Sequence, residues 1–425
     1  MVQIASKMLP PLRPLLLLLL LLLQFLAPSS SLEFTLPDVL NSIGSIGSSI
    51  VDPKLLPTPE ALLDGSKQLL AGYPFEFVSS SLNFICSQAI SSNKVKSKYT
   101  PDIKLMNFQL QTACQKVNFP LTSPEEMWKS PLFDPKKKVI ILATGWTTTV
   151  NGSDTIDVFS KAYSCRGDVN FVAVDAARFV DTLYTWSAFN TQAIGESIAQ
   201  ALEKVLHVVP VDNIHLIGHS LGAHIVGAAG RSLQNLTGKV LPRITALDPA
   251  KPCFNEGEVL SGLMRGDARF IDVIHSNSGV LGKRDPLGDV DFYPDGEGPL
   301  PTGCFSVTCA HARAWEYFAE TVFPGNEDNF PATRCSSLAK LREKHCSGGE
   351  VPMGYAVPSN VKGKYFLEVG GSSPYGLQGS AERSSKLENC GKCPDSSTTS
   401  TTEETTTAKS WLKVPGLGSI LPPIG

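Results

Sequence analysis

The sequence has 425 residues, of which 42% are hydrophobic, so the chain can bury the core of one large domain or of two. Its formal net charge is −3 and its pI is near 6.2. This balance offers no basic surplus for phosphate backbones, and we therefore expect no nucleic-acid partner.

The first 31 residues have the pattern of a secretory signal peptide. Lys7 and Arg13 supply positive charge, residues 15–23 are an unbroken leucine run, and small residues follow at 29–31. The apolar stretch is shorter than the roughly 20 residues that span a bilayer comfortably. A cleaved signal is therefore favoured over an uncleaved anchor, and the protein is expected to be secreted and extracellular.

Ten cysteines follow this segment, and an even number in an exported chain predicts disulfides rather than a metal site. The local candidate pairs are Cys304 with Cys309 and Cys335 with Cys346, while the other pairings stay open. The segment Cys390-Gly-Lys-Cys393 has the spacing of a redox motif. It lies beside a Ser/Thr tail and outside any strand–helix unit, which favours an ordinary structural disulfide.

Composition divides the rest of the chain into three parts. Residues 32–104 are predicted to be a loosely structured leader with one short helix near 59–70, residues 105–370 a packed domain, and residues 371–425 a low-complexity tail. Residues 396–407 are nearly all Ser and Thr, which predicts a solvated stalk with sites for O-glycosylation. Sequons for N-glycosylation at Asn151 and Asn235 fit export.

Strand and helix signals alternate within the packed domain. Short apolar runs predict strands at 139–143, 169–174, 214–217 and 244–247, and helical spacing appears at 193–205 and 223–233. This alternation indicates an α/β fold with a mainly parallel sheet and helices on both faces.

The segment Gly218-His219-Ser220-Leu221-Gly222 lies between a predicted strand and a predicted helix. That context is typical of a nucleophile elbow, where glycines let strand and helix cross closely and the serine hydroxyl projects above the sheet. Ser220 is therefore the candidate nucleophile, against the alternative of an ordinary tight turn.

A serine nucleophile needs a base and an orienting acid, expected in the chain order Ser, acid, His. Asp248 ends an apolar run, and a carboxylate at the end of a parallel strand faces the same crevice as the elbow. Asp272 is the rival acid, but its position inside a strand suits a structural role better.

Three histidines follow Asp248 in the chain. His275 ends a strand and His345 lies in a polar segment between cysteines. His311 is predicted on a loop that opens a helix over 312–321, close to a candidate disulfide, and it is the best candidate base. The oxyanion hole requires two backbone N–H groups, for which Leu221 and Trp146 are the candidates, Trp146 because it follows an early strand.

At this point the sequence resembles the animal pancreatic-lipase family of neutral lipases and phospholipases A1, particularly its insect members. The matching segments cover roughly residues 105–370 and are Gly218-His-Ser-Leu-Gly-Ala-His224, Ile244-Thr-Ala-Leu-Asp-Pro-Ala250, Pro252-Cys-Phe254, Phe270-Ile-Asp-Val-Ile-His275, Asp291-Phe-Tyr-Pro294, Cys309-Ala-His-Ala-Arg313 and the Cys335…Cys346 pair. The resemblance implies an α/β-hydrolase fold, the roles given above to Ser220, Asp248 and His311, and a lipid substrate at a micelle, membrane or lipoprotein surface.

The chain departs from the family pattern at two positions near the expected site. Thr144 stands where the family usually has histidine before Gly145. Family lipases often bind a structural calcium, but an ungapped comparison retains only Asp267 and puts Met264, Gly262 and Val259 at the other ligand positions. We therefore expect no metal and no cofactor, since calcium needs several oxygen ligands.

Two further departures concern the substrate. About 50 low-complexity residues follow the core, too few for the β-sandwich of pancreatic members, so no colipase-binding domain is expected. The family's lid lies between bonded cysteines, here Cys304 and Cys309, with only four residues between them. The loop from Asn277 to Asp291 is also short. Short loops beside the expected site offer little apolar surface for three acyl chains and leave the site open to polar head groups. They favour a phospholipase A1-like or general polar-lipid esterase over a triglyceride lipase.

The alternative is a non-catalytic lipid-binding or yolk-like storage protein on the same fold, because fold does not fix function. The resemblance implies that such members have lost the serine, whereas this chain has Ser220, Asp248 and His311. The complete set favours the enzyme.

Overall fold

The computed structural model describes residues 101–378, apart from 147, 149, 151–152, 181–183 and 255–259, together with residues 390–393. The expected signal peptide, leader and Ser/Thr stalk lie outside the described residues, as do Asn151 and Val259.

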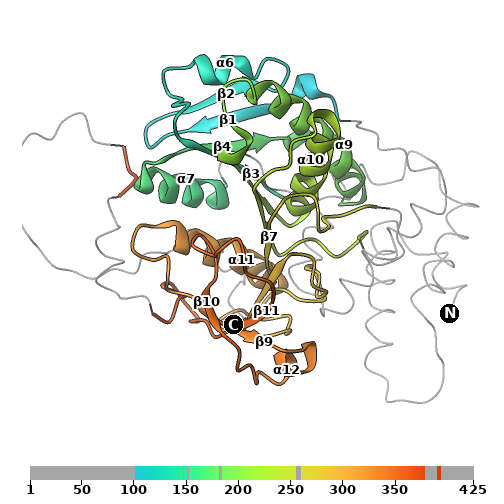
Figure 1. Ribbon diagram of the computed structural model, residues 1–425, viewed down its shortest axis with the longest axis vertical. Coiled ribbons are helices and arrows are strands. Elements are labelled where there is room, and N and C mark those ends of the chain that lie inside the picture. The colour runs from blue at the N-terminus through green and yellow to red at the C-terminus, as the bar shows by residue number, and fades with distance from the viewer. Residues whose placement is uncertain are drawn as a thin grey trace, which may run out of the picture. The chain divides into compact units, whose positions relative to one another are not determined.

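One large sheet organises these residues (Figure 1). Its strands follow the order β10-β9-β11-β8-β7-β6-β5-β3-β4-β1-β2. From β11 through to β4 neighbouring strands are parallel, and antiparallel pairs complete both edges. The strands are β1 Asn107–Gln111, β2 Lys116–Pro120, β3 Lys138–Ala143, β4 Val169–Asp175, β5 Ile214–His219, β6 Arg243–Leu247, β7 Ile271–Ile274, β8 Val290–Pro294, β9 Pro331–Cys335, β10 Glu350–Pro352 and β11 Gly363–Leu367.

Helices cover both faces of this sheet. The helices α9 and α10 share one hydrophobic cluster with the strands, and α7 and α11 share another on the opposite face. The described helices are α6 Glu125–Lys129, α7 Asp154–Arg166, α8 Ala177–Val180, α9 Tyr184–Val205, α10 Leu221–Thr237, α11 Val307–Val322 and α12 Leu338–Arg342, with 3-10 turns at Ile103–Leu105 and Val211–Asn213. The predicted parallel sheet between two helical layers is confirmed.

The apolar composition of the central strands explains this layering. Residues 139–143 of β3 are all buried, with Val139 and Ile141 in one hydrophobic cluster and Ile140 and Leu142 in the other. A strand covered on both faces must be apolar throughout, because successive side chains point to opposite sides of the sheet.

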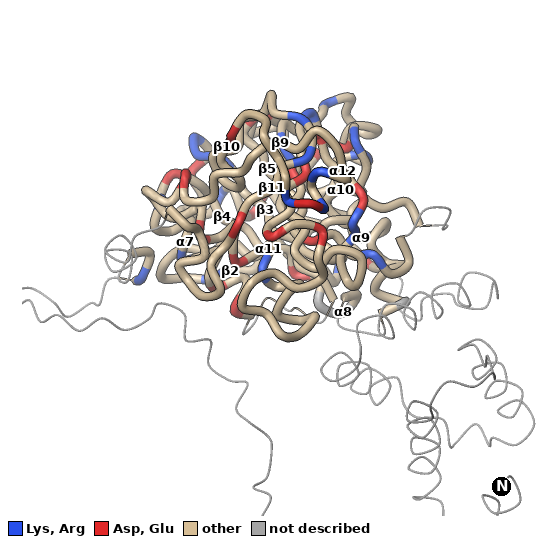
Figure 2. The backbone as a smooth tube through the Cα atoms, turned by 90° about the horizontal axis from the view of Figure 1, so that it is seen from below, with Lys and Arg blue, Asp and Glu red and all other residues tan. Residues whose placement is uncertain are grey.

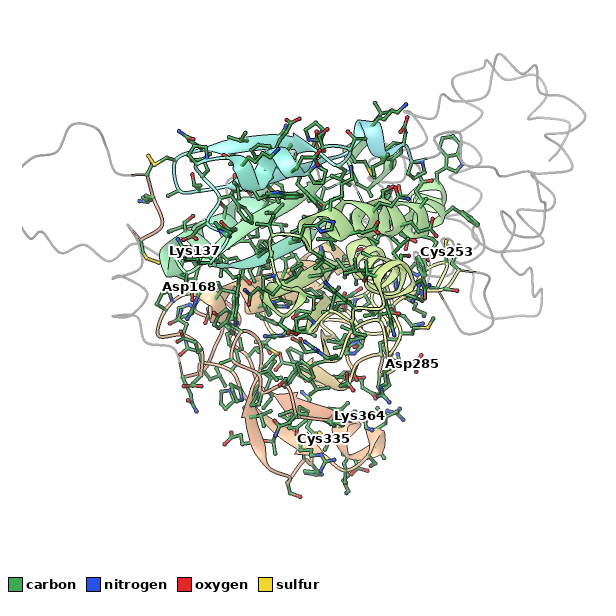
Figure 3. The ribbon with its side chains drawn as sticks, turned by 45° about the horizontal axis from the view of Figure 1, so that its top comes forward. Lys137, Asp168, Cys253, Asp285, Cys335 and Lys364 are labelled. Carbon is green, nitrogen blue, oxygen red and sulfur yellow. A yellow bond between two sulfur atoms is a disulfide. The ribbon has the colours of Figure 1, made fainter. Side chains whose placement is uncertain are left out.

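Four disulfides are defined within the described residues. Cys304–Cys309 and Cys335–Cys346 confirm the two local pairs, and Figure 3 labels Cys335 at the end of β9. The cysteines of the Cys390-Gly-Lys-Cys393 segment form structural disulfides, but with distant partners rather than with each other: Cys114–Cys393 and Cys165–Cys390. Cys253 is also disulfide-bonded.

The C-terminal part of the described chain packs onto the domain. Tyr375 is buried beside Tyr317 and the Arg313 guanidinium, and the N–H groups of Tyr375 and Gly376 bond to Glu320. Packed structure thus continues past residue 370, the predicted end of the domain.

The surface of the described part gives no sign of a membrane span or a single-sign charge field. No described helix is both long enough and apolar enough to cross a bilayer. Figure 2 shows acidic and basic positions interspersed along the backbone. Asn235 is exposed on the last turn of α10, as an N-glycosylation site must be.

Candidate active site

Ser220 joins β5 to α10 at a strained turn. Its φ is 59° and its ψ is −123°, a conformation that costs a non-glycine residue on the order of 1–3 kcal/mol. The flanking glycines are required for space: a Cβ on Gly218 would lie 2.3 Å from Gly222 O, and one on Gly222 would lie 2.0 Å from Ala143 O. This strand–turn–helix geometry is that of the predicted elbow.

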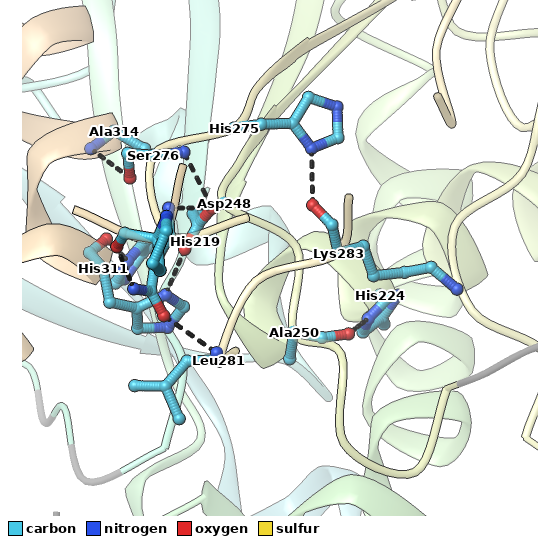
Figure 4. Close-up of polar contacts among 12 residues, drawn as sticks. His219, His224, Asp248, Ala250, His275, Ser276, Leu281, Lys283, His311 and Ala314 are labelled. Carbon is cyan, nitrogen blue, oxygen red and sulfur yellow. Dashed lines mark hydrogen bonds and ion pairs between the residues drawn. The ribbon is translucent and has the colours of Figure 1, made fainter. Parts of the chain in front are cut away.

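Asp248 follows β6, the neighbour of β5, at the same edge of the sheet. Its side chain is fully buried, and Oδ1 accepts the backbone N–H groups of Ser276 at 2.9 Å and Asn277 at 3.0 Å. These bonds fix one carboxylate oxygen and leave Oδ2 directed at His311 (Figure 4).

The Nδ1 atom of His311 lies 2.5 Å from Asp248 Oδ2. A carboxylate accepts the Nδ1 proton, so the neutral ring keeps a lone pair on Nε2, as a general base requires. The expected loop position of His311 is wrong. The Ser306 hydroxyl oxygen accepts the Cys309 N–H and caps α11. The helix therefore starts at Val307, and His311 lies within its first two turns.

The rival residues occupy other environments. Asp272 makes two bonds to the Arg243 guanidinium near the opposite ends of the strands, which is the predicted structural role. His275 is buried, with its ring bonded to Lys283 O and Asp291, and in Figure 4 it lies apart from His311. The side chain of His345 is 77% exposed.

His219 connects the elbow to the helix that carries His311. Its Nε2 lies 3.0 Å from the main-chain oxygen of His311, and the two rings are 4.7 Å apart between centroids. Burial, and then the charge of His311, lower the pKa of His219 to about 3, so its ring is neutral at physiological pH.

The two expected oxyanion donors lie beside the elbow. Leu221 is the first residue of α10, and first-turn N–H groups lack helical acceptors. Trp146 follows Gly145, which is so close to Ser220 that a Cβ there would stand 2.5 Å from the serine Cβ. The Thr144 hydroxyl donates to Thr148 O at 3.2 Å, so the residue at the family's usual histidine position braces this loop.

An apolar wall adjoins Ser220. Leu221, Tyr184 and Phe254 are buried in one cluster, and Trp146 packs edge-on against Tyr184 at 5.4 Å between centroids. The imidazole of His224 stacks on Phe254 at 3.8 Å. Tyr184, Leu221 and Phe254 are buried and Trp146 is partly buried, so Trp146 forms a partly accessible edge of this cluster.

Asp267, the retained position of the family's calcium site, contacts a protein cation. Its Oδ1 lies 2.6 Å from Arg231 Nη1, and its Oδ2 accepts the Met264 N–H at 2.9 Å. Among the described residues no group of three or more His, Cys, Asp or Glu side chains is arranged to hold a metal ion.

The predicted short lid is a disulfide-bonded loop two residues before His311. The Cys304–Cys309 bond closes it with a Cα–Cα distance of 5.6 Å. Phe305 at its tip is 93% exposed, so an aromatic ring extends into solvent six positions before His311 in the chain.

Two contributions to the site were not anticipated from the sequence. His219 is part of the elbow motif, but only the folded chain brings its ring to the His311 carbonyl. Gly282 lies against the Asp248 carboxylate. Glycine is common in loops, so its presence there gave no signal of a close approach.

Comparison with known proteins places these features in a family. A family model described as Lipase matches residues 79–375. The chain is 37% identical to "Vitellogenin-3" of Drosophila melanogaster, covering 55% of each chain. It is 33% identical to "Pancreatic lipase-related protein 2" of Rattus norvegicus, covering 53% of this chain and 52% of that protein. It is also 29% identical to "Inactive pancreatic lipase-related protein 1" of Homo sapiens, covering 57% and 58%. The chain thus spans about half the length of these relatives.

Proposed function

Because the chain belongs to the lipase family and has an α/β-hydrolase fold, we propose that it is a secreted carboxylic-ester hydrolase acting on lipids through Ser220, His311 and Asp248. The observation that carries the proposal is the 2.5 Å contact between His311 and a buried Asp248 at the same sheet edge as the strained Ser220. Secretion is supported by the signal-like N-terminus and by the disulfides, which form in oxidising compartments.

The mechanism follows from the roles of the three side chains. Ser220 Oγ attacks the ester carbonyl carbon while His311 Nε2 takes the hydroxyl proton, and Asp248 stabilises the resulting imidazolium. Leu221 and Trp146 N–H groups bind the negative oxygen of the tetrahedral intermediate. The C–O bond breaks as His311 protonates the departing alcohol, leaving an acyl-serine, and water then repeats the sequence to release the fatty acid.

Within the described residues Ser220 Oγ and the His311 ring are not hydrogen-bonded to each other. Catalytic hydrogen bonds of this kind are often long without substrate and tighten in the Michaelis complex. Proximity is supported instead by the neighbouring His219, which contacts His311 through both its ring and its Nε2 atom.

The short disulfide loop supports a polar lipid as substrate. Four residues between Cys304 and Cys309 cannot carry a helix that caps a long cleft. Without such a helix a polar head group can approach Ser220, and the partly buried Trp146 ring is the apolar surface that we propose for one acyl chain. We therefore place phospholipase A1-like hydrolysis ahead of triglyceride hydrolysis.

A yolk-like storage or lipid-binding role is the second candidate, favoured by the 37% identity to a protein named vitellogenin. The storage role predicts that the protein binds lipid without hydrolysing it. The enzyme role predicts hydrolysis that depends on Ser220, His311 and Asp248.

The deciding experiment compares the purified wild-type chain with Ser220→Ala on labelled phosphatidylcholine and triolein. Loss of the nucleophile should lower kcat by on the order of 10³-fold or more. Ser197→Ala is the matched control, because Ser197 is a buried serine on α9 whose hydroxyl donates to Ala193 O within the same helix. Binding of lipid by a wild type with no measurable hydrolysis would favour the storage role.

A further inference from the structure

We propose that His219 is a positioning residue, which fixes the height of His311 over Ser220 by donating a hydrogen bond to the His311 main-chain oxygen. The inference rests on the proposed function and extends it to a residue outside the Ser-His-Asp set.

The direction of this bond follows from its two atoms. A carbonyl oxygen only accepts, so the His219 Nε2 that lies 3.0 Å from His311 O carries the proton. Since His219 is the last residue of β5 and Ser220 follows it, one side chain links the nucleophile's own backbone to the backbone of the base. Ser220 and His311 are 91 positions apart in the chain and belong to different elements. A direct link between their backbones therefore helps to fix the position of one relative to the other.

Two contacts besides His219 already restrain His311. The contact of Asp248 to Nδ1 sets the direction of the imidazole, and the Ser276 hydroxyl holds α11 three residues further on, at the Ala314 N–H. The His219 hydrogen bond holds α11 at His311 itself. The ring contact, at 4.7 Å and an interplanar angle of 42°, limits side-chain rotation as well.

The charge state of His219 suits this role. The groups that face it are His311, whose charge lowers its pKa, and Asp248, whose charge raises it, while burial has the largest effect and keeps the ring neutral. A neutral ring does not repel the imidazolium that forms on His311 during the reaction.

The test uses three substitutions of His219 in the full chain. Gln places its amide NH₂ where Nε2 stood and keeps the donor, Asn places it near Nδ1 and loses the bond, and Phe keeps the ring without a donor. We expect His219→Phe and His219→Asn to lower kcat for a soluble short-chain ester by about 30-fold with KM within about twofold, because small misplacements of a catalytic group cost up to about 10² in rate. His219→Gln should stay within about threefold of wild type.

His215 provides the matched control. It lies near the start of the same strand, and its Nε2 bonds to Thr245 Oγ1 at 2.8 Å, at the opposite end from Ser220. His215→Phe should lower the melting temperature but leave kcat unchanged. A second readout is the rate at which an organophosphonate labels Ser220, which should fall in parallel with kcat.

The outcomes separate this inference from the proposed function. An active Ser220→Ala protein would overturn both. An inactive Ser220→Ala protein together with wild-type kcat in His219→Phe and His219→Asn would overturn the positioning role alone, and so would equal losses in His219→Gln and His219→Phe. If the Phe variant fails to fold, the Gln and Asn pair gives the same decision.

Discussion

Gly282 lies directly against the carboxylate of Asp248: a β-carbon on Gly282 would stand 2.2 Å from Oδ1 and 2.5 Å from Oδ2. Its N–H donates to Asn277 O at 3.1 Å, so it closes the turn whose N–H groups hold the same carboxylate. Glycine serves here for close approach.

Gly282→Ala should therefore displace Asp248 and lower kcat by about 10²-fold, the size expected for a misplaced catalytic group. Gly298→Ala is the control, because a β-carbon there meets nothing within 4 Å. Steady-state kinetics on a soluble ester decides; equal kcat in both variants would mean that the site tolerates the shift.

Activity should not depend on calcium, because both oxygens of Asp267 already have partners in Arg231 and the Met264 N–H. A chelator should leave kcat unchanged, and loss of activity that added calcium restores would contradict this.

Arg231→Gln should lower the free energy of unfolding by about 3 kcal/mol, since it leaves the buried carboxylate of Asp267 unpaired. Lys116→Gln, which breaks a pair with Asp157 that is exposed on both sides, should cost less than about 1 kcal/mol in the same urea titration.

The C-terminal disulfides should matter for stability and the tail beyond them should not matter for catalysis. A chain truncated after Cys393 should keep its kcat, since the disulfides Cys114–Cys393 and Cys165–Cys390 remain.

The paired change Cys165→Ser with Cys390→Ser should lower the free energy of unfolding by about 2–4 kcal/mol, because it frees a long loop in the unfolded chain. The same change at Cys335 and Cys346, which are 11 residues apart, should cost less.

Local constraints explain what could be predicted from the sequence. The elbow is visible because Gly218 and Gly222 are needed within five residues of one another, and Asp248 is separated from Asp272 by its place at a strand end. Long-range contacts explain the rest. The local sequence of Cys390-Gly-Lys-Cys393 does not predict disulfide partners that are 225 and 279 positions away. The elbow motif likewise does not predict that the His219 ring contacts α11.

Buried neutral histidines should make stability fall with acid. Burial is the main cause that lowers the pKa of His224 to about 3, below the usual 6.5, so between these values the unfolded chain binds a proton that the folded chain does not. The free energy of unfolding therefore decreases as pH falls through this window, by about 2 kcal/mol per such histidine between pH 7 and pH 5.

His224→Gln removes one of these protons while its amide can still donate to Ala250 O. The loss of stability between pH 7 and pH 5 should shrink by about that 2 kcal/mol, and urea unfolding at the two pH values measures it. His207→Gln, at an exposed position, serves as control. An undiminished loss in the His224 variant would show that this ring is protonated in the folded state.

The last prediction concerns the lipid surface. A lid that must open gives a jump in rate when substrate forms micelles, but the Cys304–Cys309 loop is too short to cover a cleft. We therefore expect the rate on a short-chain ester to rise smoothly through its micelle threshold, and phosphatidylcholine to be hydrolysed faster than triolein. A sharp jump with a triolein preference would contradict this and leave the roles of Ser220 and His311 unaffected.

Phe305 can let the same loop bind the lipid surface. With 93% of its surface exposed beside the site, its ring can enter the lipid interface, where burying an aromatic side chain is worth about 2 kcal/mol. Phe305→Ser should thus weaken binding to phosphatidylcholine vesicles by about 30-fold, with kcat on the soluble ester unchanged. Leu377→Ser is the control, because Leu377 is 59% exposed but lies beside the Asn329 turn that follows α11, at the far end of that helix from His311. Equal vesicle binding by both variants would assign surface attachment to other residues, whereas a loss confined to Phe305→Ser places the open crevice against the lipid.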